Sequence, residues 1–242
     1  MTARSGEETQ VIKQRDIGNG YFSLIVGPLR DYKRARPGSF IHVKLCSDKI
    51  YFRRAMSVAA VDSDNKTLEM IYHRVGRGTS YMATLRKGDK LNVLGPLGVP
   101  FSMPRKNERV VCVAGGVGMP PLYYLASHLV AKGFDPSKIE FLYGGRSKDD
   151  IIEQARLKKL KVKLRIATDN GTIGQRGLVT DLLDEFHSIN GSGKLKLYAC
   201  GPEGMLAAVN RYALQNGISG ELSLEAPMPC GIGVCLGCVV EL

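Results

Sequence analysis

Tryptophan is absent from this chain of 242 residues, and so is any long apolar run. Gly and Pro interrupt the apolar stretches before they reach the length of a bilayer, so no membrane span is predicted. The first eight residues contain no apolar stretch, which excludes a secretory signal peptide and favours a cytoplasmic location. Acidic residues are also scarce, with 23 against 34 basic ones and a net charge of +11.

The basic excess does not predict a nucleic-acid-binding protein. Its densest group alternates with aliphatic residues, and a period of two predicts that the cations share one face of a strand: Lys159, Lys161, Lys163 and Arg165. Such faces are usually solvated or guard a sheet edge, and no aromatic residues are interleaved here. We therefore expect no nucleic acid, and instead an anionic cofactor or an acidic partner subunit.

Cysteine is also sparse, and three of the six cysteines lie at the end of the chain. Cys230, Cys235 and Cys238 form a C-x4-C-x2-C pattern, which is typical of a plant-type 2Fe–2S ligand set. Thiolates suit iron and sulfide, and the intervening glycines allow a tight loop that points N–H groups at the sulfurs. A disulfide with a spare thiol, or a zinc knuckle, is the alternative, but no His follows Cys238.

A fourth cysteine ligand is missing from the pattern, because the sequence given ends at Leu242. The other cysteines lie in apolar segments, where we expect Cys46 and Cys112 to be small core residues and Cys200 either that or functional. We therefore expect a shortened chain whose natural form continues to a fourth cysteine. As it stands, the chain is expected to hold a cluster poorly or not at all.

Short β segments separated by turn signals occupy residues 9–103, at 20–26, 39–45, 57–61, 67–72 and 90–94. Regular short strands of this kind predict a small antiparallel barrel, with one helix at 79–85. From Arg109 the pattern alternates, with strands at 110–114, 139–143, 161–167 and 195–199 and helices at 121–132, 149–157, 179–186 and 203–216. This alternation predicts a Rossmann-like parallel sheet with helices on both faces.

Three domains follow from these changes in pattern. The barrel is expected to span residues 1–104 and the α/β domain residues 105–219, with a hinge at 104–108. After Gly217 the chain is expected to leave the α/β unit, and 220–242 forms the cysteine segment.

Two turns of the α/β part carry the pattern of a nucleotide site. Gly115, Gly116 and Gly118 follow the first strand and lead to Pro121, so a pyrophosphate could approach the backbone at a helix N-terminus. The pattern is G-x-G-x-x-P and not the dinucleotide fingerprint, although a plain turn rarely needs so many glycines. The second turn follows another strand at the same sheet edge, where the cysteine either faces a nicotinamide ring or is structural: Cys200, Gly201 and Pro202.

The barrel has phosphate-suited features of its own. Arg53 and Arg54 are adjacent in apolar surroundings, and a guanidinium matches phosphate oxygens. Gly76–Thr79 opens the predicted helix, and Gly95–Gly98 closes the barrel. Each taken alone could be surface decoration or a plain turn; together they predict a second, larger phosphate-bearing ligand.

These motifs together resemble the ferredoxin–NADP reductase superfamily: R-x-x-S, G-x-G-T, G-P-L-G, G-G-x-G-x-P-P and C-G-P. The segment Ala167–Asp181 and the cysteine motif are similar to one branch, the electron-transfer subunits of class 1B dihydroorotate dehydrogenase. The resemblance spans about Val11 to Cys238. It implies FAD in the barrel, NAD in the α/β domain, 2Fe–2S in the cysteine segment, and an FMN-containing partner subunit that oxidises dihydroorotate, joined in a hetero-oligomer such as a heterotetramer.

The resemblance also implies roles for particular residues. Those expected to bind FAD are Arg54, Ala55, Met56, Ser57, Ile71, Tyr72, His73, Gly78 and Thr79. Met56 stands where many relatives have a Tyr stacked on the flavin. Those expected to bind NAD are Gly115, Gly116, Gly118, Pro121, Asp169, Cys200, Gly201 and Pro202. Asp169 would accept hydrogen bonds from ribose hydroxyls and repel the 2′-phosphate of NADP, although it could equally be an ordinary turn residue.

Two other functions remain open from the sequence. One is a diaphorase subunit of another flavin and iron–sulfur complex, of the hydrogenase or NADPH–ferredoxin oxidoreductase type. The other is a non-catalytic regulatory module that has kept the fold and lost the cluster, which the incomplete cysteine set keeps open.

Overall fold

The computed structural model describes residues 6–190 and 194–240, which fold into two compact units. One unit contains the chain up to Pro100 together with the segment from Ala226 onward, and the other runs from Phe101 to Glu225. The three cysteines of the C-terminal segment are therefore in the same compact unit as the N-terminal strands, whereas residues 220–225 belong to the other unit. Within the described ranges, no helix is both long enough and apolar enough to cross a membrane.

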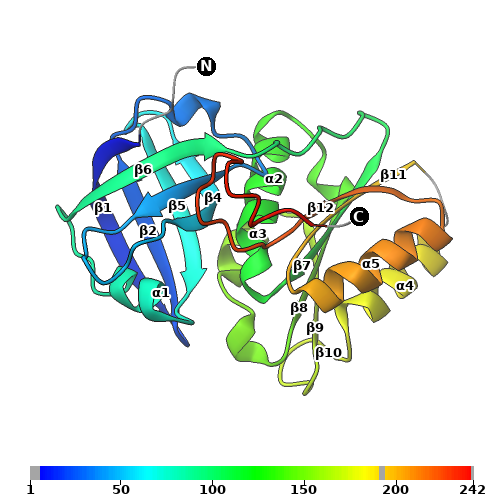
Figure 1. Cartoon of the computed structure of the whole chain (residues 1–242). Helices are drawn as coiled ribbons and strands as arrows, with labels where there is room; N and C mark the ends of the chain where they lie inside the picture. The colour runs from blue at the N-terminus through cyan, green and yellow to red at the C-terminus, as the bar shows by residue number, and fades with distance from the viewer. Residues whose placement is uncertain (1–5, 191–193, 241–242) are drawn as a thin grey trace. The chain divides into compact units, whose positions relative to one another are not determined.

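The N-terminal strands form an antiparallel barrel, as predicted (Figure 1). The barrel is closed, and its strand order is β1-β2-β5-β4-β3-β6. Closure pairs every strand on both sides and leaves no free edge. The strands are β1 Glu7–Gly18, β2 Tyr21–Gly27, β3 Phe40–Lys44, β4 Arg54–Asp62, β5 Thr67–His73 and β6 Lys90–Leu97. Strand β1 was not singled out from sequence because polar residues fill most of it, with only Thr9 and Val11 buried.

The barrel is filled mainly by β2 and β5, which are buried along almost their whole lengths. Leu24, Val26, Leu68 and Met70 are fully shielded from solvent. Helix α1, Arg77–Met82, follows β5 close to where a helix was expected, and its N-terminus places Gly78 and Thr79 beside the barrel strands.

The second unit is a parallel sheet in the order β10-β9-β8-β7-β11-β12 (Figure 1). From β7 the chain first builds outward through β8 and β9, and it then crosses to the other side of β7 to form β11. The carboxyl ends of β7 and β11 therefore meet at the switch point where α/β sheets bind ligands. The strands are β7 Arg109–Gly115, β8 Ile139–Gly145, β9 Lys163–Thr168, β10 Gln175–Arg176, β11 Leu195–Cys200 and β12 Ser219–Ser223.

Helices cover both faces of this sheet, as the alternation predicted: α2 Met119–Ala131, α3 Gln154–Lys159, α4 Val179–Asn190 and α5 Glu203–Gln215 (Figure 1). On one face, α4 and α5 pack on the strands through a shared apolar core that includes Val111, Leu142, Leu183, Phe186 and Val209. Because both faces are covered, β7 and β8 are apolar and buried along nearly their whole lengths.

Two expectations about the strands were wrong. The chain does not leave the α/β unit after Gly217, because Ser219–Ser223 forms β12 and pairs in parallel with β11. The sequence of β12 is short and only half-buried, so it gave no apolar signal. Nor do the four cations share one strand face: Lys159 ends α3, Lys161 has a positive φ of 58°, and β9 begins at Lys163.

The cysteines outside the C-terminal segment differ from each other. Cys112 is fully buried in β7, as expected. Cys46 is exposed, contrary to expectation, because β3 ends at Lys44 and the chain has already left the barrel wall.

Candidate functional site

The glycine turn after β7 and the Cys200 turn after β11 lie against each other at the switch point. The two strands are paired so that Cys200 stands opposite Ala114. A Cβ added at Gly118 would lie 2.1 Å from the carbonyl oxygen of Cys200, and one at Gly201 would lie 3.0 Å from the Cα of Gly115. Only glycine permits so close an approach, so the fold brings together the two turns that the sequence placed at one edge.

The donors for an anion in the first turn come from its glycine stretch. Gly116 has a positive φ of 50°, and α2 begins at Met119. Pro120 and Pro121 are buried in the first turn of the helix and carry no backbone N–H. The helix dipole still favours negative charge here, but fewer N–H groups are available than at a glycine-only turn.

Cys200 is buried, with 1% of its surface exposed. Burial and the nearby Glu225 carboxylate together raise the pKa of its thiol to about 12, against a hydrogen bond with Ser223 that lowers it. The thiol therefore stays protonated at neutral pH, and since the thiolate is the reactive form, Cys200 is not a nucleophile. A neutral, compact thiol suits the wall of a nicotinamide pocket as well as a packing role.

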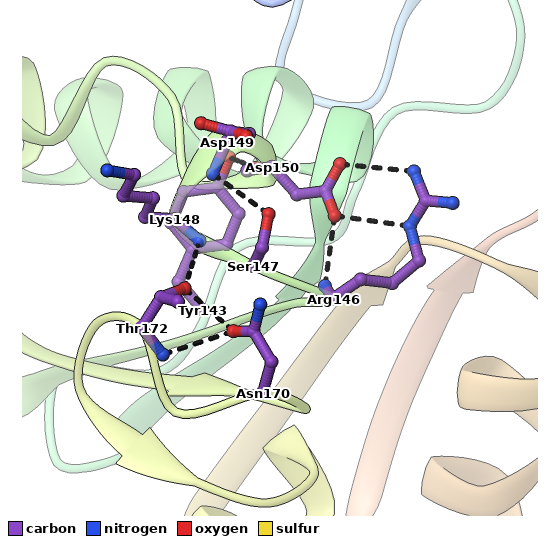
Figure 2. A network of polar contacts seen from close by, with 8 residues as sticks. All are labelled: Tyr143, Arg146, Ser147, Lys148, Asp149, Asp150, Asn170 and Thr172. Atoms are coloured by element: carbon purple, nitrogen blue, oxygen red, sulfur yellow. Dashed lines mark hydrogen bonds and ion pairs between the residues drawn. The ribbon is translucent and has the colours of Figure 1, made fainter.

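The loop after β8 forms a polar network beside this edge (Figure 2). Arg146 donates to the Asp150 carboxylate through its backbone N–H at 3.0 Å and through Nε at 3.2 Å. Asp150 is buried, whereas the Arg146 side chain is 81% exposed. The carboxylate therefore binds one edge of the guanidinium, and the rest of the guanidinium stays accessible to solvent. In the neighbouring loop, Thr172 accepts from the Lys148 N–H at 2.9 Å and bonds Asn170 at 2.7 Å.

Tyr143 connects this network to the glycine turn. Its hydroxyl lies 3.0 Å from the carbonyl oxygen of Gly116 and 3.2 Å from that of Asp150, and it accepts the N–H of Ile152 at 3.2 Å. Sequence reasoning missed Tyr143, Arg146 and Asp150; the available signal was a Tyr at the carboxyl end of an apolar strand. Asp169 follows β9 and is exposed, with its backbone N–H bonded to the carbonyl of Gly145 at 3.1 Å.

In the barrel, the two adjacent arginines have different roles. Arg53 donates to the carbonyls of His42 and Asn92 and to the Asn92 side chain, so it stabilises the barrel wall. Arg54 instead lies against α1: a Cβ at Gly78 would be 2.2 Å from its Nε. The glycine of the G-x-G-T motif therefore leaves room for the Arg54 guanidinium, and the structure brings these two expected FAD-binding residues together.

The other residues expected to bind FAD lie on the neighbouring strands β4 and β5, except Thr79, which lies in α1. Met56, Ile71, Tyr72 and Thr79 are buried, while Ala55, Ser57 and His73 are partly exposed. The His73 ring stacks on Tyr21 with centroids 4.3 Å apart. The Thr79 hydroxyl accepts the N–H groups of Val75 and Gly76 at 3.0 and 3.1 Å, so Thr79 shapes the turn that presents Gly78.

The cysteine segment directs backbone N–H groups toward sulfur, as its glycines predicted. Hydrogen bonds from the backbone of Cys235, Ile232 and Val234, together with the Cys235 thiol, lower the pKa of Cys230 to about 6. Gly231 and Gly233 make this loop possible with φ values of +69° and +78°. The Cys230 thiol is therefore stabilised as the thiolate, which is the form that binds metal.

The segment only partly assembles the expected ligand set. The sulfurs of Cys230 and Cys235 are 3.3 Å apart, and the N–H of Gly237 lies 3.5 Å from the Cys235 sulfur. Across residues 6–190 and 194–240, no three His, Cys, Asp or Glu side chains form a group able to hold a metal ion. The donors have the right chemistry for iron and sulfide, and Cys238 is not gathered with the other two.

Comparison with known proteins agrees with this geometry. The family pattern of the oxidoreductase NAD-binding domain matches residues 112–211, which include both turns at the switch point. The chain is 34% identical over 246 residues to the dihydroorotate dehydrogenase B (NAD(+)) electron transfer subunit of Shouchella clausii, covering 100% of this chain and 90% of that protein. The subunit of the same name from Bacillus cereus is 34% identical over 236 residues, covering 96% and 87%.

Solved structures show the same fold. An NADH-dependent reduced ferredoxin–NADP oxidoreductase, studied for flavin-based electron bifurcation, aligns with a TM-score of 0.83 and 29% identity over 95% of this chain and 80% of that one. The ferredoxin–NADP+ reductase of Neisseria gonorrhoeae, solved with FAD and NADP, aligns with a TM-score of 0.75 and 16% identity over 92% and 100%.

Proposed function

The chain belongs to the family of electron transfer subunits of dihydroorotate dehydrogenase B (NAD(+)), and from this premise we propose its place in the reaction. It carries electrons from a separate FMN-containing subunit, which oxidises dihydroorotate in pyrimidine biosynthesis, and delivers them to NAD+. The two subunits act as a hetero-oligomer.

One observation of the structure supports this proposal most directly. Gly118 packs on the carbonyl of Cys200 and thereby joins two turns from different strands into one surface at the switch point. A nicotinamide nucleotide needs a backbone surface for its pyrophosphate and a neutral wall for its ring, and these turns supply both. The protonated Cys200 thiol adds no charge to the place where the ring would lie.

The barrel residues are proposed to hold FAD. Arg54, beside Gly78, offers a guanidinium to a flavin phosphate, while Ala55, Ser57 and His73 line the partly exposed strand ends next to it. When bound, FAD supplies both hydride and single-electron chemistry, and a 2Fe–2S cluster supplies single-electron chemistry. Met56 is buried and leaves the flavin face without an aromatic partner at this position.

The cysteine segment is proposed to hold the cluster through Cys230, Cys235 and Cys238, with a fourth ligand from the partner subunit or from further chain to complete the set. The backbone N–H groups aimed at the Cys230 sulfur favour the anionic ligand form before metal arrives. Iron would draw Cys238 toward the other two, because ligand geometry is commonly completed by the metal itself.

A coupled assay tests the proposal. The purified chain is combined with the dihydroorotate-oxidising subunit, and NADH formation is followed after addition of dihydroorotate and NAD+. We expect dihydroorotate-dependent NADH formation only when both subunits are present, and NADH reduction of the bound flavin by this chain alone. Equal NADH formation without this chain, or no flavin reduction by NADH, would contradict the proposal.

A second assay tests the barrel assignment. Flavin released by heating is identified by chromatography, and we expect FAD. Arg54→Ala should weaken FAD binding by roughly 1.5–3 kcal/mol, because a charge-assisted hydrogen bond to phosphate is lost. Recovery of FMN alone would refute the assignment of FAD to the barrel.

A further inference from the structure

His42 occupies an unusual place in the wall of the barrel. It lies in β3, opposite Ala55 of β4 and Leu94 of β6. Side chains alternate across a strand, so His42 lies on the face opposite to Ile41 and Val43. All three residues are 0% exposed, so something other than the barrel interior must cover the histidine.

The cover over His42 is the cysteine segment. A Cβ added at Gly231 would lie 2.4 Å from the Nδ1 atom of His42 and 2.5 Å from its Cε1. Gly231, with a φ of +69°, directly follows Cys230, so the imidazole lies beneath the loop that begins at the first cysteine. Both residues belong to the same compact unit of the chain.

The ring nitrogens of His42 have no hydrogen-bond partner in the described structure, although both are buried. Arg53 bonds the backbone carbonyl of His42 and does not serve the ring. A neutral imidazole has one N–H donor and one acceptor, and a buried polar group without a partner is destabilising and rare. The N–H group of the ring therefore lacks a hydrogen-bond acceptor among the described residues around it.

We propose that His42 is a positioning residue for the cysteine segment, and that its ring N–H donates a hydrogen bond to a sulfur of the cluster held there. The inference rests on the proposed function, because the sulfides and thiolates of that cluster are the acceptors. They would arrive in the loop that already covers the imidazole. Hydrogen bonds to the sulfurs of an iron–sulfur cluster help to set its reduction potential, since they stabilise the more negative reduced state.

The test compares two substitutions in the holoprotein with its complete ligand set, the partner subunit included, purified without oxygen and loaded with iron and sulfide. His42→Phe keeps a planar ring and removes the donor, whereas His42→Gln keeps an N–H donor. Iron and sulfide content is measured first, and the cluster is then titrated against ambient potential with an electron paramagnetic resonance readout. His187→Phe is the matched control, because its Nδ1 is also buried and unpartnered but lies in the other unit.

We expect His42→Phe to retain iron and sulfide while its ratio of reduced to oxidised cluster falls about tenfold at a fixed potential. For a one-electron couple this corresponds to about 59 mV. His42→Gln and His187→Phe should stay close to the unsubstituted chain. A cooperative thermal transition in each variant verifies folding.

Three results would overturn the inference. An unchanged potential in His42→Phe would show that the ring donates nothing to the cluster. Loss of iron from both His42→Phe and His42→Gln, but not from His187→Phe, would make His42 a ligand and not a hydrogen-bond donor. Absence of iron and sulfide from the unsubstituted chain would contradict the cluster assignment itself, and that failure is recognised before any variant is compared.

Discussion

The turn pair of the α/β unit and the cysteine segment both combine glycine with cysteine, yet their surroundings differ. Cys200 is 1% exposed and its thiol pKa is raised to about 12, because packing around the two turns excludes water. Cys235 is exposed, and Cys230 has a thiol pKa lowered to about 6 by N–H groups of its own loop. Apolar side chains of the segment, such as Val234 at 75%, are also exposed.

The difference shows two ways of preparing a redox site. At the switch point, packing of the protein alone fixes the backbone, so the surface exists before a nucleotide arrives. In the cysteine segment the loop favours thiolates but gathers only two sulfurs, so on the proposed function the remaining order would come from metal binding. Substitutions at the switch point should therefore lower the stability of the fold, whereas substitutions of the cysteines should lower the metal content.

The largest effect is expected from Cys235→Ser. Removing this thiol should abolish iron and sulfide binding and stop electron delivery from the partner subunit, because a hydroxyl is a poor ligand for this cluster. NADH should still reduce the flavin at an unchanged rate, since that step needs only the barrel and the α/β unit. Iron and sulfide analysis and stopped-flow flavin reduction measure the two properties.

Cys46→Ser is the control for Cys235→Ser, because Cys46 is also exposed but lies outside the segment. It should retain both properties. If Cys235→Ser kept a full complement of iron and sulfide, the ligand assignment would be wrong.

Gly118→Ala should have the next largest effect. It should lower the stability of the fold and leave the cysteine segment unchanged. Its Cβ would meet the Cys200 carbonyl at 2.1 Å, so the two turns must separate. We expect a loss of roughly 1–3 kcal/mol in the free energy of unfolding, together with slower flavin reduction by NADH. Thermal or urea unfolding and the NADH assay measure these effects.

The matched control for Gly118→Ala is Gly204→Ala at the start of α5, where nothing lies within 4 Å of the added Cβ. It should be neutral or stabilising by up to about 1 kcal/mol, since Ala favours helix. Equal stability of the two variants would show that the turns are not held together by close packing.

Much of this comparison was predictable from sequence, for physical reasons that differ by region. The glycine turns and their shared edge followed from strand alternation and the connectivity of parallel sheets. The place of the cysteine segment did not, because its contact with His42 pairs residues from distant parts of the chain and leaves no periodic pattern. Tyr143 was missed for a similar reason: its hydroxyl joins Gly116 to Asp150, while its sequence context is simply that of a buried strand.

The thiols of Cys230 and Cys200 should also react with an alkylating reagent over different pH ranges in the reduced, metal-free chain. The thiolate is the reactive form, so lowering the pKa of Cys230 makes it reactive at lower pH. Alkylation of Cys230 by iodoacetamide should be half-maximal near pH 6 and reach a plateau above it, whereas Cys200 should remain unmodified at neutral pH. Mass spectrometry of peptides from a pH series measures both. Similar pH profiles for the two cysteines would refute the claim that the two regions shift their thiol pKa values in opposite directions.

The smallest effect is expected from Asp169→Asn, which lies in the α/β unit and should change the preference between NADH and NADPH. Its exposed carboxylate follows β9, and its backbone is bonded to Gly145, the residue before Arg146. The Arg146 guanidinium would attract a 2′-phosphate, but the buried Asp150 carboxylate already binds it, which leaves Asp169 to repel that phosphate. Asp169→Asn should therefore raise kcat/KM for NADPH relative to NADH.

The expected change for Asp169→Asn is about fivefold, because a charge interaction in water at close range is worth about 1 kcal/mol. It should shrink as salt is added, since exposed charges are screened. Asp149→Asn removes the same charge from an exposed position in the β8 loop, and it should leave the preference nearly unchanged. If Asp149→Asn shifted the preference as much as Asp169→Asn, general surface charge would set the choice of nucleotide. A preference of the unsubstituted chain for NADPH would refute the role of Asp169 directly.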